Sequence, residues 1–354
     1  MEAMVPRTTL SFYRYVRLED PWAFRGELLR QWSALGVFGR TYLAHEGVNA
    51  QVSLPTALLH AFRNILNAIP EFTGVPLKIA VEENGRSFRK LTIKVKPKLV
   101  ADGLPDGTFD STNVGEHLDA GTFDLLHQDG ATVVDMRNNY ECAIGHFEGA
   151  YLPRSGTFRD VLHEVTDAMA GRRQESILLY CTGGIRCEKA SAWLRHQGFS
   201  NVCQLHGGII DYVRQVRAQG RESRFKGRNF VFDDRLSERI TDDLLGTCVQ
   251  CGQATDRIAN CMEESCNLLL VQCPQCAAKY ADCCSPSCRE IHLLPVEAQR
   301  EWRKGRVTRS TITKAVTNAQ AHQELIREQE AALALNGTLH PELSDVTRKV
   351  IPAS

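Results

Sequence analysis

The six residues from Cys181 to Arg186, with the segments on either side, constrain the fold of this chain more than any other feature. An apolar run over 177–180 leads into the cysteine, and a helical pattern over 187–197 follows the arginine and ends at Gly198. The loop itself reads Cys-Thr-Gly-Gly-Ile-Arg. A strand that turns through glycines into a helix aims backbone N–H groups and the positive helix end at one sulfur. We therefore predict that a strand, a glycine-rich loop and a helix start surround the sulfur of Cys181.

This loop predicts a reactive cysteine. Its surroundings stabilise a thiolate and an anion bound beside it, and Arg186 adds a fixed positive charge. The structural alternative is a buried, inert cysteine at a strand end, which is common, but that role needs neither two glycines nor an arginine. We predict Cys181 and Arg186 as the catalytic residues, and the residues between them form the predicted active-site loop: Thr182, Gly183, Gly184 and Ile185.

The length of the loop separates two kinds of enzyme. Cysteine phosphatases place five residues between the cysteine and the arginine, whereas this chain has four. The tighter loop resembles that of rhodanese domains, which hold a persulfide on the cysteine. A second stretch, D-x-R-x3-E-x3-G-H-x2-G-A from Asp135 to Ala150, resembles the motif that precedes the catalytic half of rhodanese domains. Together these resemblances imply a central rhodanese α/β domain with a parallel sheet and disfavour a phosphatase.

Four residues near the loop are predicted to support it without taking part directly in the chemistry: Asp135, Arg137, Glu141 and Cys187. Arg137 and Glu141 lie four residues apart, a spacing that suits an ion pair within one helical turn. Cys187 follows the loop at the start of the helix. It is either a resolving thiol or a packed helix residue, and we favour packing.

The chain is long enough, at 354 residues, for two or three domains. Over residues 8–97 the strand and amphipathic-helix patterns follow the order β-α-β-β-α-β, which predicts a ferredoxin-like (acylphosphatase-like) α+β domain. Phe230-Val231-Phe232 also reads as a strand. The predicted division is 8–97 for the ferredoxin-like domain, 98–120 for a linker, 121–220 for the rhodanese domain, 221–294 for a Cys-rich domain, and 295–354 for a polar helical tail that is partly disordered.

Nine of the thirteen cysteines lie between Cys248 and Cys288. Two C-x2-C pairs among them match the thiolate pairs that hold tetrahedral zinc. We predict two structural zinc ions whose cysteine ligands alternate along the chain. One of Cys283 and Cys284 is then not a zinc ligand. Buried or redox-active thiols and an iron–sulfur cluster are the alternatives, and His292 is a possible substitute ligand. The predicted ligands are Cys248, Cys251, Cys273 and Cys276 for one ion, and Cys261, Cys266, Cys284 and Cys288 for the other.

The net charge is zero, so nothing global favours nucleic acid or a membrane as a partner. The N-terminus lacks a secretion signal and no apolar run reaches 18 residues, so we expect a cytoplasmic protein without membrane contact. Any RNA contact must then rest on local basic patches. The alternative is that these basic residues only form a solvent-exposed surface and bind no RNA. Two patches supply the RNA-binding candidates: Arg86, Arg89, Lys90, Lys94 and Lys96, and then Arg224, Lys226 and Arg228.

The extended motif from Cys181 to Ala190, C-T-G-G-I-R-C-E-K-A, resembles the active-site signature of the bacterial tRNA uridine(34) hydroxylases. The segments around Tyr140, at 207–209 and at 230–235 resemble the same family, and so does Glu46-Gly47-Val48-Asn49 near the N-terminus. This resemblance covers residues 8–290. It implies a tRNA-modifying oxidoreductase that binds the anticodon region of tRNA and makes 5-hydroxyuridine at the wobble position, with molecular oxygen as co-substrate.

From the residues themselves we derive only a thiolate or persulfide at Cys181. Our hypothesis is that this thiolate acts as the nucleophile or redox centre, with addition to C6 of uracil as one route. The alternative function is a rhodanese-type sulfurtransferase that moves sulfane sulfur through a Cys181 persulfide. A third reading, a non-enzymatic RNA-binding adaptor, is disfavoured by the intact loop. No nucleotide cofactor is predicted, because the chain shows no dinucleotide-binding fingerprint.

Overall fold

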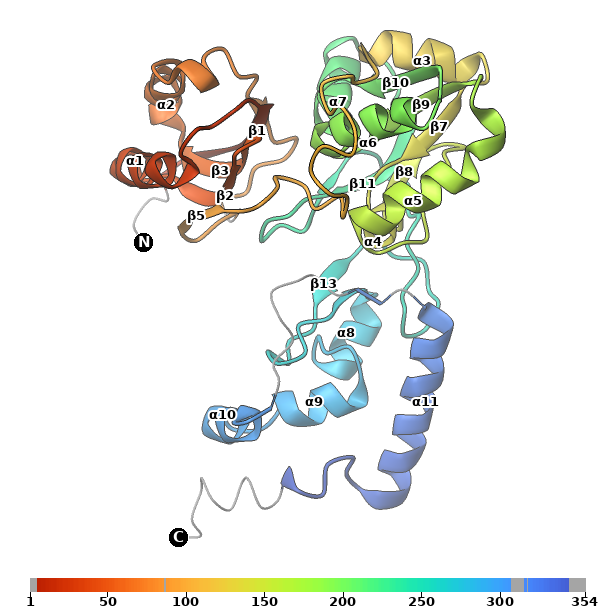
Figure 1. Ribbon diagram of the computed structural model, residues 1–354. Coiled ribbons are helices and arrows are strands. Elements are labelled where there is room, and N and C mark those ends of the chain that lie inside the picture. Colours follow the sequence, from red (N-terminus) through yellow and green to blue (C-terminus); the bar gives the residue numbers. More distant parts are fainter. Residues whose placement is uncertain (1–4, 86, 307–314, 317, 344–354) are drawn as a thin grey trace. The chain divides into compact units, whose positions relative to one another are not determined.

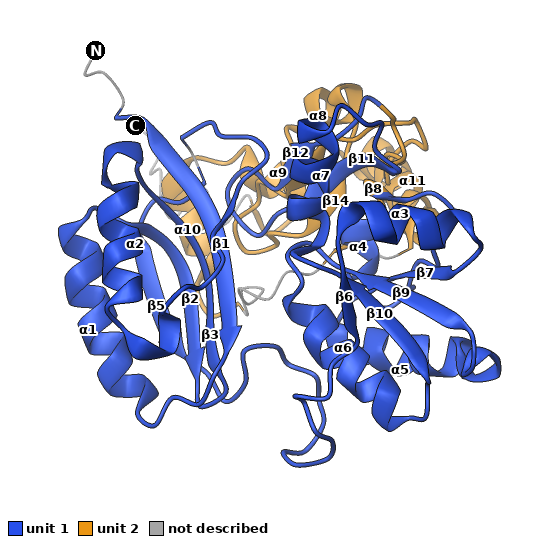
Figure 2. Ribbon diagram, turned by 90° about the horizontal axis from the view of Figure 1, so that it is seen from above, with its two compact units in different colours: residues 1–142, 146–242 blue, residues 143–145, 243–354 orange. Residues whose placement is uncertain are grey.

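The computed structural model describes residues 5–85, 87–306, 315–316 and 318–343. The chain divides into two compact units, one made of residues 1–142 and 146–242 and the other of 143–145 and 243–354 (Figure 2). Among the described helices, none combines the length and the apolar character that crossing a membrane requires.

The N-terminal part of unit 1 is a five-stranded sheet with two helices on one face (Figure 1). Asp20 caps the first helix by accepting from the backbone N–H groups of Trp22 and Ala23, and Pro21 opens its first turn. Trp32 and Phe62, one from each helix, pack with Phe12 of the sheet in the core. The elements are β1 (Arg7–Tyr15), α1 (Pro21–Ala34), β2 (Phe38–Ala44), β3 (Gly47–Pro55), α2 (Leu59–Asn67), β4 (Lys78–Ile79) and β5 (Leu91–Val95), with short 3-10 turns η1 (Thr56–Leu58) and η2 (Pro70–Phe72).

The strand order of this sheet is β4-β1-β3-β2-β5. β4, only two residues long, pairs antiparallel with β1 and was not foreseen in the sequence. β5 is the strand that the pattern predicted as the last one, and it pairs in parallel with β2 at the opposite edge. The predicted ferredoxin-like, acylphosphatase-like fold is confirmed, with one additional strand. Two residues carry too short an apolar pattern to be recognised as a strand.

The second part of unit 1 is built around a four-stranded parallel sheet of order β6-β10-β9-β7. This confirms the predicted central α/β domain with a parallel sheet. The elements are β6 (Glu116–Leu118), α3 (Ala120–Gln128), β7 (Thr132–Asp135), α4 (Asn139–Cys142), β8 (Gly145–Phe147), α5 (Phe158–Ala168), η3 (Ala170–Arg172), β9 (Ser176–Tyr180), α6 (Ile185–His196), β10 (Asn201–Leu205) and α7 (Gly208–Ala218).

Strand β9 is buried on both faces, which explains its unbroken apolar run. Ile177 and Leu179 belong to the core beneath α5 and α6, whereas Leu178 and Tyr180 belong to the core on the other face. The side-chain alternation of a strand therefore places Cys181 in line with Leu179, in the first of these cores.

Two segments differ in detail from the sequence prediction. β6 lies at 116–118, inside the segment that we predicted as a linker, because three residues of an edge strand carry little periodicity. The strand that we predicted at 230–232 runs instead over β11 (Phe225–Phe230) and pairs antiparallel with β12 (Ser237–Arg239), while β8 supplies the third strand of that sheet.

Unit 2 contains the cysteine-rich segment. Its two short strands pair antiparallel, and two of its helices begin directly after capping residues, Cys273 and Ser285. The elements are β13 (Ile258–Asn260), β14 (Leu269–Val271), α8 (Pro274–Tyr280), α9 (Pro286–His292), α10 (Val296–Arg303) and α11 (Ala319–Asn336). The polar segment after residue 295 thus contains two helices, α10 and α11, among its described residues, and the part of the predicted disorder that falls on 344–354 lies outside the described residues.

Candidate functional site

Cys181 lies at the carboxyl end of β9, where the chain turns into α6. Gly184 caps the helix with φ of +99°, a conformation that residues other than glycine rarely adopt. The start of α7 closes on the loop from the side, because Ile209 donates its backbone N–H to the carbonyl of Cys181. A Cβ at Gly208 would lie 2.5 Å from that carbonyl oxygen, so this close approach requires glycine. The loop is held by backbone contacts on both sides.

The environment of the Cys181 sulfur favours its ionised form. Gly184 donates its backbone N–H to the sulfur at 3.1 Å. Burial opposes ionisation, but a hydrogen bond from the Cys187 thiol, the charge of Arg186 and the backbone N–H groups of Cys187 and Arg186 outweigh it and lower the pKa of Cys181 to about 5. Burial and the hydrogen bond to Cys181 raise the pKa of Cys187, so Cys187 remains a neutral donor. At pH 7 the site holds one thiolate and one thiol.

The sulfur of Cys181 is also covered, because the residue is only 1% exposed. Its loop neighbours Thr182 and Gly183 are half-buried. The sulfur therefore lies beneath the surface of the loop in this structure.

Glu141 holds Arg186 in place. Its two carboxylate oxygens accept from the two terminal nitrogens of Arg186 at 2.6 and 2.9 Å, and the same guanidinium donates to the hydroxyl of Thr182 at 3.3 Å. Glu141 is fully buried. Burial alone would lower the pKa of Arg186, but Glu141 raises it above its ordinary value. The guanidinium therefore keeps its charge beside the loop.

The predicted ion pair between Arg137 and Glu141 is wrong. Arg137 folds back onto Asp135, which accepts from its side chain at 2.6 Å, and it lies against the rings of Tyr180 and Phe225. Arg137 lies before α4, which begins at Asn139, so the two residues do not share a helical face. Glu141 is left to bind Arg186, which lies 45 residues further along the chain.

The N-terminal sheet supplies a second wall of the site, which the sequence analysis missed. Tyr13 donates its hydroxyl to Glu188 of α6 at 2.8 Å, and Tyr15 donates to the carbonyl of Ile185 at 3.4 Å. Lys189 binds Glu46 at 3.0 Å. Tyr13 and Tyr15 lie two residues apart on β1 and so share one face of the strand. That alternation was the only signal in the sequence, and it does not reveal the partner.

Glu188 accepts hydrogen bonds from three different side chains at this site. Besides Tyr13 it accepts from Nε2 of His117 at 3.0 Å and from the side-chain amide of Gln204 at 3.2 Å. Burial raises the pKa of Glu188, but His117 and Tyr13 outweigh this effect and leave the pKa lowered. Glu188 is therefore an ionised anchor that ties β1 to the helix carrying the loop.

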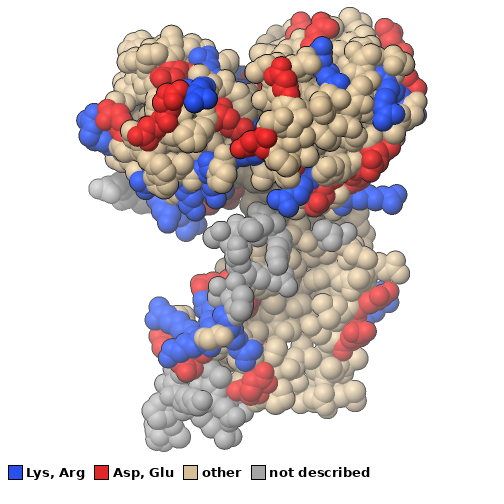
Figure 3. Space-filling model, viewed as in Figure 1, with Lys and Arg blue, Asp and Glu red and all other residues tan. Residues whose placement is uncertain are grey.

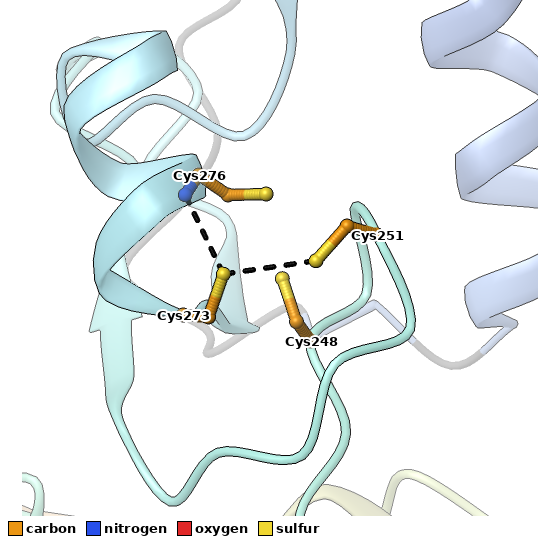
Figure 4. Close-up of side chains that lie close together, drawn as sticks. All are labelled: Cys248, Cys251, Cys273 and Cys276. Carbon is orange, nitrogen blue, oxygen red and sulfur yellow. Dashed lines mark hydrogen bonds between the residues drawn. The ribbon is translucent and has the colours of Figure 1, made fainter.

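The cysteines of unit 2 form two groups of four that can each hold a metal ion. Within each group the sulfurs all lie within 4.8 Å of one another. Figure 4 shows the first group, in which Cys251 and Cys273 place their sulfurs 3.6 Å apart. Four thiolates about 2.3 Å from a central zinc would be spaced by about 3.8 Å, so the donor set fits a tetrahedral metal. The groups are Cys248, Cys251, Cys273 and Cys276, and Cys261, Cys266, Cys284 and Cys288.

Cys283 belongs to neither group. Its sulfur lies 3.5 Å from the carbonyl of Ala281. His292 is also absent from both groups among the described residues. Of the two neighbouring cysteines, it is Cys284 whose sulfur lies 3.7 Å from Cys266 and 3.6 Å from Cys288.

The RNA-binding candidates separate into two sets. On the N-terminal sheet, Lys90, Lys94 and Lys96 are exposed, and Arg89 is exposed although it pairs with Asp234. Basic side chains gather near β5 in the view of Figure 3, while acidic and basic residues are interspersed over the rest of that face of unit 1. Arg86 lies outside the described residues.

The second set is largely engaged within the fold. Lys226 binds Glu222 at 3.0 Å, and Arg228 donates to the hydroxyl of Ser237 at 2.9 Å. Arg224 is half-buried. The basic side chains near β5 are therefore more exposed and less engaged in contacts within the fold than those of the second set.

Comparison with known proteins adds to this geometry. Three family models match successive parts of the chain, described as a UPF0176 acylphosphatase like domain at residues 7–99, a rhodanese-like domain at 120–215 and a rhodanase C-terminal region at 226–289. A protein of Leptospira interrogans named tRNA uridine(34) hydroxylase is 50% identical over 302 residues, covering 85% of this chain and 82% of its own length. Proteins of the same name from Cronobacter sakazakii and Escherichia coli K12 are 49% and 48% identical, covering 85% and 75% of this chain and 87% and 76% of their own lengths.

Proposed function

This chain belongs to the tRNA uridine(34) hydroxylase family, and on that premise we propose that the Cys181 thiolate attacks the uridine at position 34 of tRNA. The protein is an enzyme that modifies tRNA, an oxidoreductase that hydroxylates this wobble uridine. The chemistry assigned to Cys181 rests on one observation above all. The backbone N–H of Gly184 donates to the buried sulfur at 3.1 Å beside the charged Arg186, and this environment lowers the pKa of Cys181 to about 5.

A thiolate suits the first step of this reaction. C5 of uracil resists attack by oxygen because the ring is electron-poor. Addition of the sulfur to C6 forms an S–C6 bond and moves the C5=C6 electron pair towards C5 and O4, which makes C5 nucleophilic. Loss of the thiolate later restores the double bond. We propose molecular oxygen as the source of the new hydroxyl oxygen. One oxygen atom bonds to C5, whose hydrogen leaves as a proton, the other oxygen atom leaves as water, and an external two-electron donor supplies the electrons that this requires.

The other residues of the site keep the thiolate charged and oriented. Arg186, held by Glu141, supplies a fixed positive charge, and the N–H group of Gly184 and the thiol of Cys187 donate to the sulfur. Asp135 and Arg137 brace the strand end from within the core. A base stacked in the anticodon loop cannot reach a buried sulfur, so the uridine leaves its stack to enter the site.

We propose that the two cysteine groups of unit 2 bind structural zinc. Zinc would supply a cross-link that holds β13, β14 and the start of α8 and α9 together, since each group is all-sulfur and leaves no open position. About two zinc ions per chain are expected by elemental analysis of the purified protein. A folded protein without metal would overturn this proposal.

The anticodon region of tRNA is the proposed binding partner. The exposed lysines near β5 are the proposed phosphate contacts, because they are less engaged than those of β11. A tRNA substrate also supports the predicted cytoplasmic location. Replacing Lys94 and Lys96 together by Ala is expected to weaken tRNA binding and to reduce its dependence on salt concentration.

Deletion of the gene tests the function directly. Bulk tRNA from the deletion strain should lack 5-hydroxyuridine and its derivatives by mass spectrometry, and wild-type protein should restore them, whereas Cys181→Ser should not. Unchanged modification after deletion would refute the function in that cell. Rescue by Cys181→Ser would refute the role of the thiolate and leave the tRNA assignment intact.

A rhodanese-type sulfurtransferase is the second candidate, favoured by the loop of four residues between Cys181 and Arg186. In that case the same thiolate would accept sulfane sulfur and pass it on. A thiosulfate–cyanide assay distinguishes the two functions. Turnover that approaches the rate of tRNA hydroxylation would favour the sulfurtransferase.

A further inference from the structure

The side chain of Lys78 is largely buried, and the described part of the chain provides no hydrogen-bond acceptor for its ammonium group. Lys78 opens the short strand β4 and is 5% exposed. Among the described residues no hydrogen bond or ion pair reaches its Nζ atom, which lies 4.4 Å from the centre of the Tyr13 ring. Burying a charged amine costs several kcal/mol unless an acceptor compensates, and a cation–π contact of about 0.5–2 kcal/mol offsets only part of this. A residue of this kind points to a missing partner.

The position of Lys78 places this missing partner beside the reactive loop. β4 pairs with β1, with Lys78 opposite Ser11, and Arg214 of α7 donates to the carbonyl of Ile79 at 3.4 Å. The Tyr13 ring that Lys78 faces is itself close to the loop, since a Cβ at Gly184 would lie 2.7 Å from the Tyr13 hydroxyl. The ammonium, the ring and the loop therefore meet at one place within unit 1.

The charges that act on Lys78 are those of the site. Burial lowers the pKa of Lys78, while Asp211, Cys181 and Glu188, in that order, act to raise it. Asp211 lies beyond the 4.0 Å limit of an ion pair with Lys78, and burial raises the pKa of this carboxyl group. Arg214 and His206 also act on Asp211. The ammonium is thus within electrostatic range of the thiolate and of a carboxyl group, and no hydrogen bond joins it to either one.

We propose that Lys78 is a catalytic residue that donates a hydrogen bond to O4 of the target uracil. This inference rests on the proposed addition of Cys181 to C6. When the S–C6 bond forms, the C5=C6 electron pair moves towards C4 and the carbonyl pair moves onto O4. O4 then carries the negative charge of an enolate, while Lys78 keeps its proton and holds that charge. No bond other than the two π bonds breaks, and expulsion of the thiolate reverses the step.

A neutral carbonyl fits this position better than a phosphate. Asp211 and Glu188 both act on Lys78, so a permanently charged phosphate would be repelled there. A carbonyl oxygen enters uncharged and gains charge only as the thiolate loses its own. The hydrogen bond from Lys78 is therefore stronger in the intermediate than in the substrate, and a difference of this kind accelerates a reaction.

The role of Lys78 can be measured at C5, independently of hydroxylation. The enolate takes a solvent proton at C5 and loses the original hydrogen when the thiolate leaves, so a reversible adduct exchanges this hydrogen. The probe is a tRNA transcript with uridine at position 34, made with 5-deuterated UTP and incubated without oxygen with the full-length protein. Loss of deuterium at position 34 is followed by mass spectrometry, and hydroxylation is measured separately in air.

Replacing Lys78 by Met should slow both exchange and hydroxylation by about 10²–10³-fold, the usual effect of removing one donor to a developing oxyanion. The affinity for tRNA should stay within about threefold. In Lys78→Ala, added methylammonium should restore part of the exchange, which a purely structural role would not allow. Lys304→Met, which removes an exposed lysine paired with Glu301 in unit 2, is the matched control and should leave both rates unchanged.

Stability separates a catalytic from a structural lysine as well. Because its ammonium is buried without an acceptor, Lys78→Met should melt at the same temperature as the wild type or higher. Wild-type exchange in Lys78→Met would overturn the inference and leave the function standing. So would a wild-type enzyme that hydroxylates position 34 but never exchanges its C5 hydrogen. A wild-type protein that does neither overturns the proposed function, and the inference falls with it.

Discussion

Cys181 and the cysteine groups of unit 2 illustrate two ways of keeping sulfur ionised: by dipoles and a fixed charge at Cys181 and, as we propose, by a metal ion in unit 2. At Cys181 a single thiolate is stabilised by N–H groups, by one neutral thiol and by one guanidinium. In each group of unit 2 four sulfurs lie within 4.8 Å of one another. If all four were thiolates, backbone dipoles could not offset so much negative charge. Only a shared cation can. Stabilisation by dipoles leaves the sulfur able to attack a substrate, whereas stabilisation by a metal uses its electron pair.

Metal removal should give the largest effect and tests the unit 2 side of this comparison. Cys276→Ser should lower the zinc content from about two ions per chain to about one, and should melt unit 2, since structural zinc contributes on the order of 10 kcal/mol to folding in small domains. Elemental analysis and thermal melting measure both. Cys283→Ser is the matched control, because Cys283 lies outside both groups, and it should keep both ions. Loss of metal in that variant would contradict our ligand assignment.

Glu141→Gln tests whether the Cys181 site depends on a buried ion pair in place of a metal. It leaves the guanidinium of Arg186 without its partner carboxylate and should lower the free energy of unfolding by about 3–5 kcal/mol. The positive charge is then less neutralised, so the pKa of Cys181 should fall further. Urea unfolding measures the first effect. Glu148→Gln, at an exposed glutamate that lies 3.7 Å from Lys226, should change the stability by less than about 0.5 kcal/mol.

The pH dependence of alkylation tests the charge on Cys181 itself. With its pKa lowered to about 5, this sulfur is almost fully ionised from pH 6 to pH 8, so its rate with a small alkylating reagent should stay nearly constant. An unshifted thiol would gain about tenfold per pH unit, or about 100-fold over this range. Peptide mapping by mass spectrometry follows Cys181, and Cys203, whose pKa is raised by burial, serves as the internal contrast. An alkylation rate of Cys181 that rises about tenfold per pH unit would disprove that Cys181 is a thiolate at neutral pH.

Tyr13→Phe should have the smallest effect on stability. It tests how far the Cys181 site depends on a segment that is distant in the chain. The zinc groups use only residues of one segment, whereas the Cys181 site draws on β1 far away in sequence. Loss of the hydroxyl removes one hydrogen bond to Glu188 and should cost about 1 kcal/mol, since His117 and Gln204 still donate. Tyr42→Phe is the control on the neighbouring part of the sheet. Equal stability of the two variants would show that the contact to Glu188 contributes little.

Local patterns were sufficient for much of this molecule. The strand, loop and helix around Cys181, the helix that begins after Asp20 and the fold class of both parts of unit 1 follow from spacing within a few residues. Short elements were missed, because the two residues of β4 and the three of β6 carry too little pattern.

The amino-acid sequence by itself determined that Cys181 stands between a strand and a helix start and that cysteine pairs recur at metal-binding spacing. These are properties of neighbouring residues, governed by local backbone geometry. The fold was needed to show that Arg186 binds Glu141, that Arg137 turns to Asp135, that Tyr13 binds Glu188 beside the loop, and that Lys78 lies over the Tyr13 ring. Such contacts join segments that are distant in the chain, and the direction of each long side chain depends on turns and packing that leave no periodic trace in the sequence.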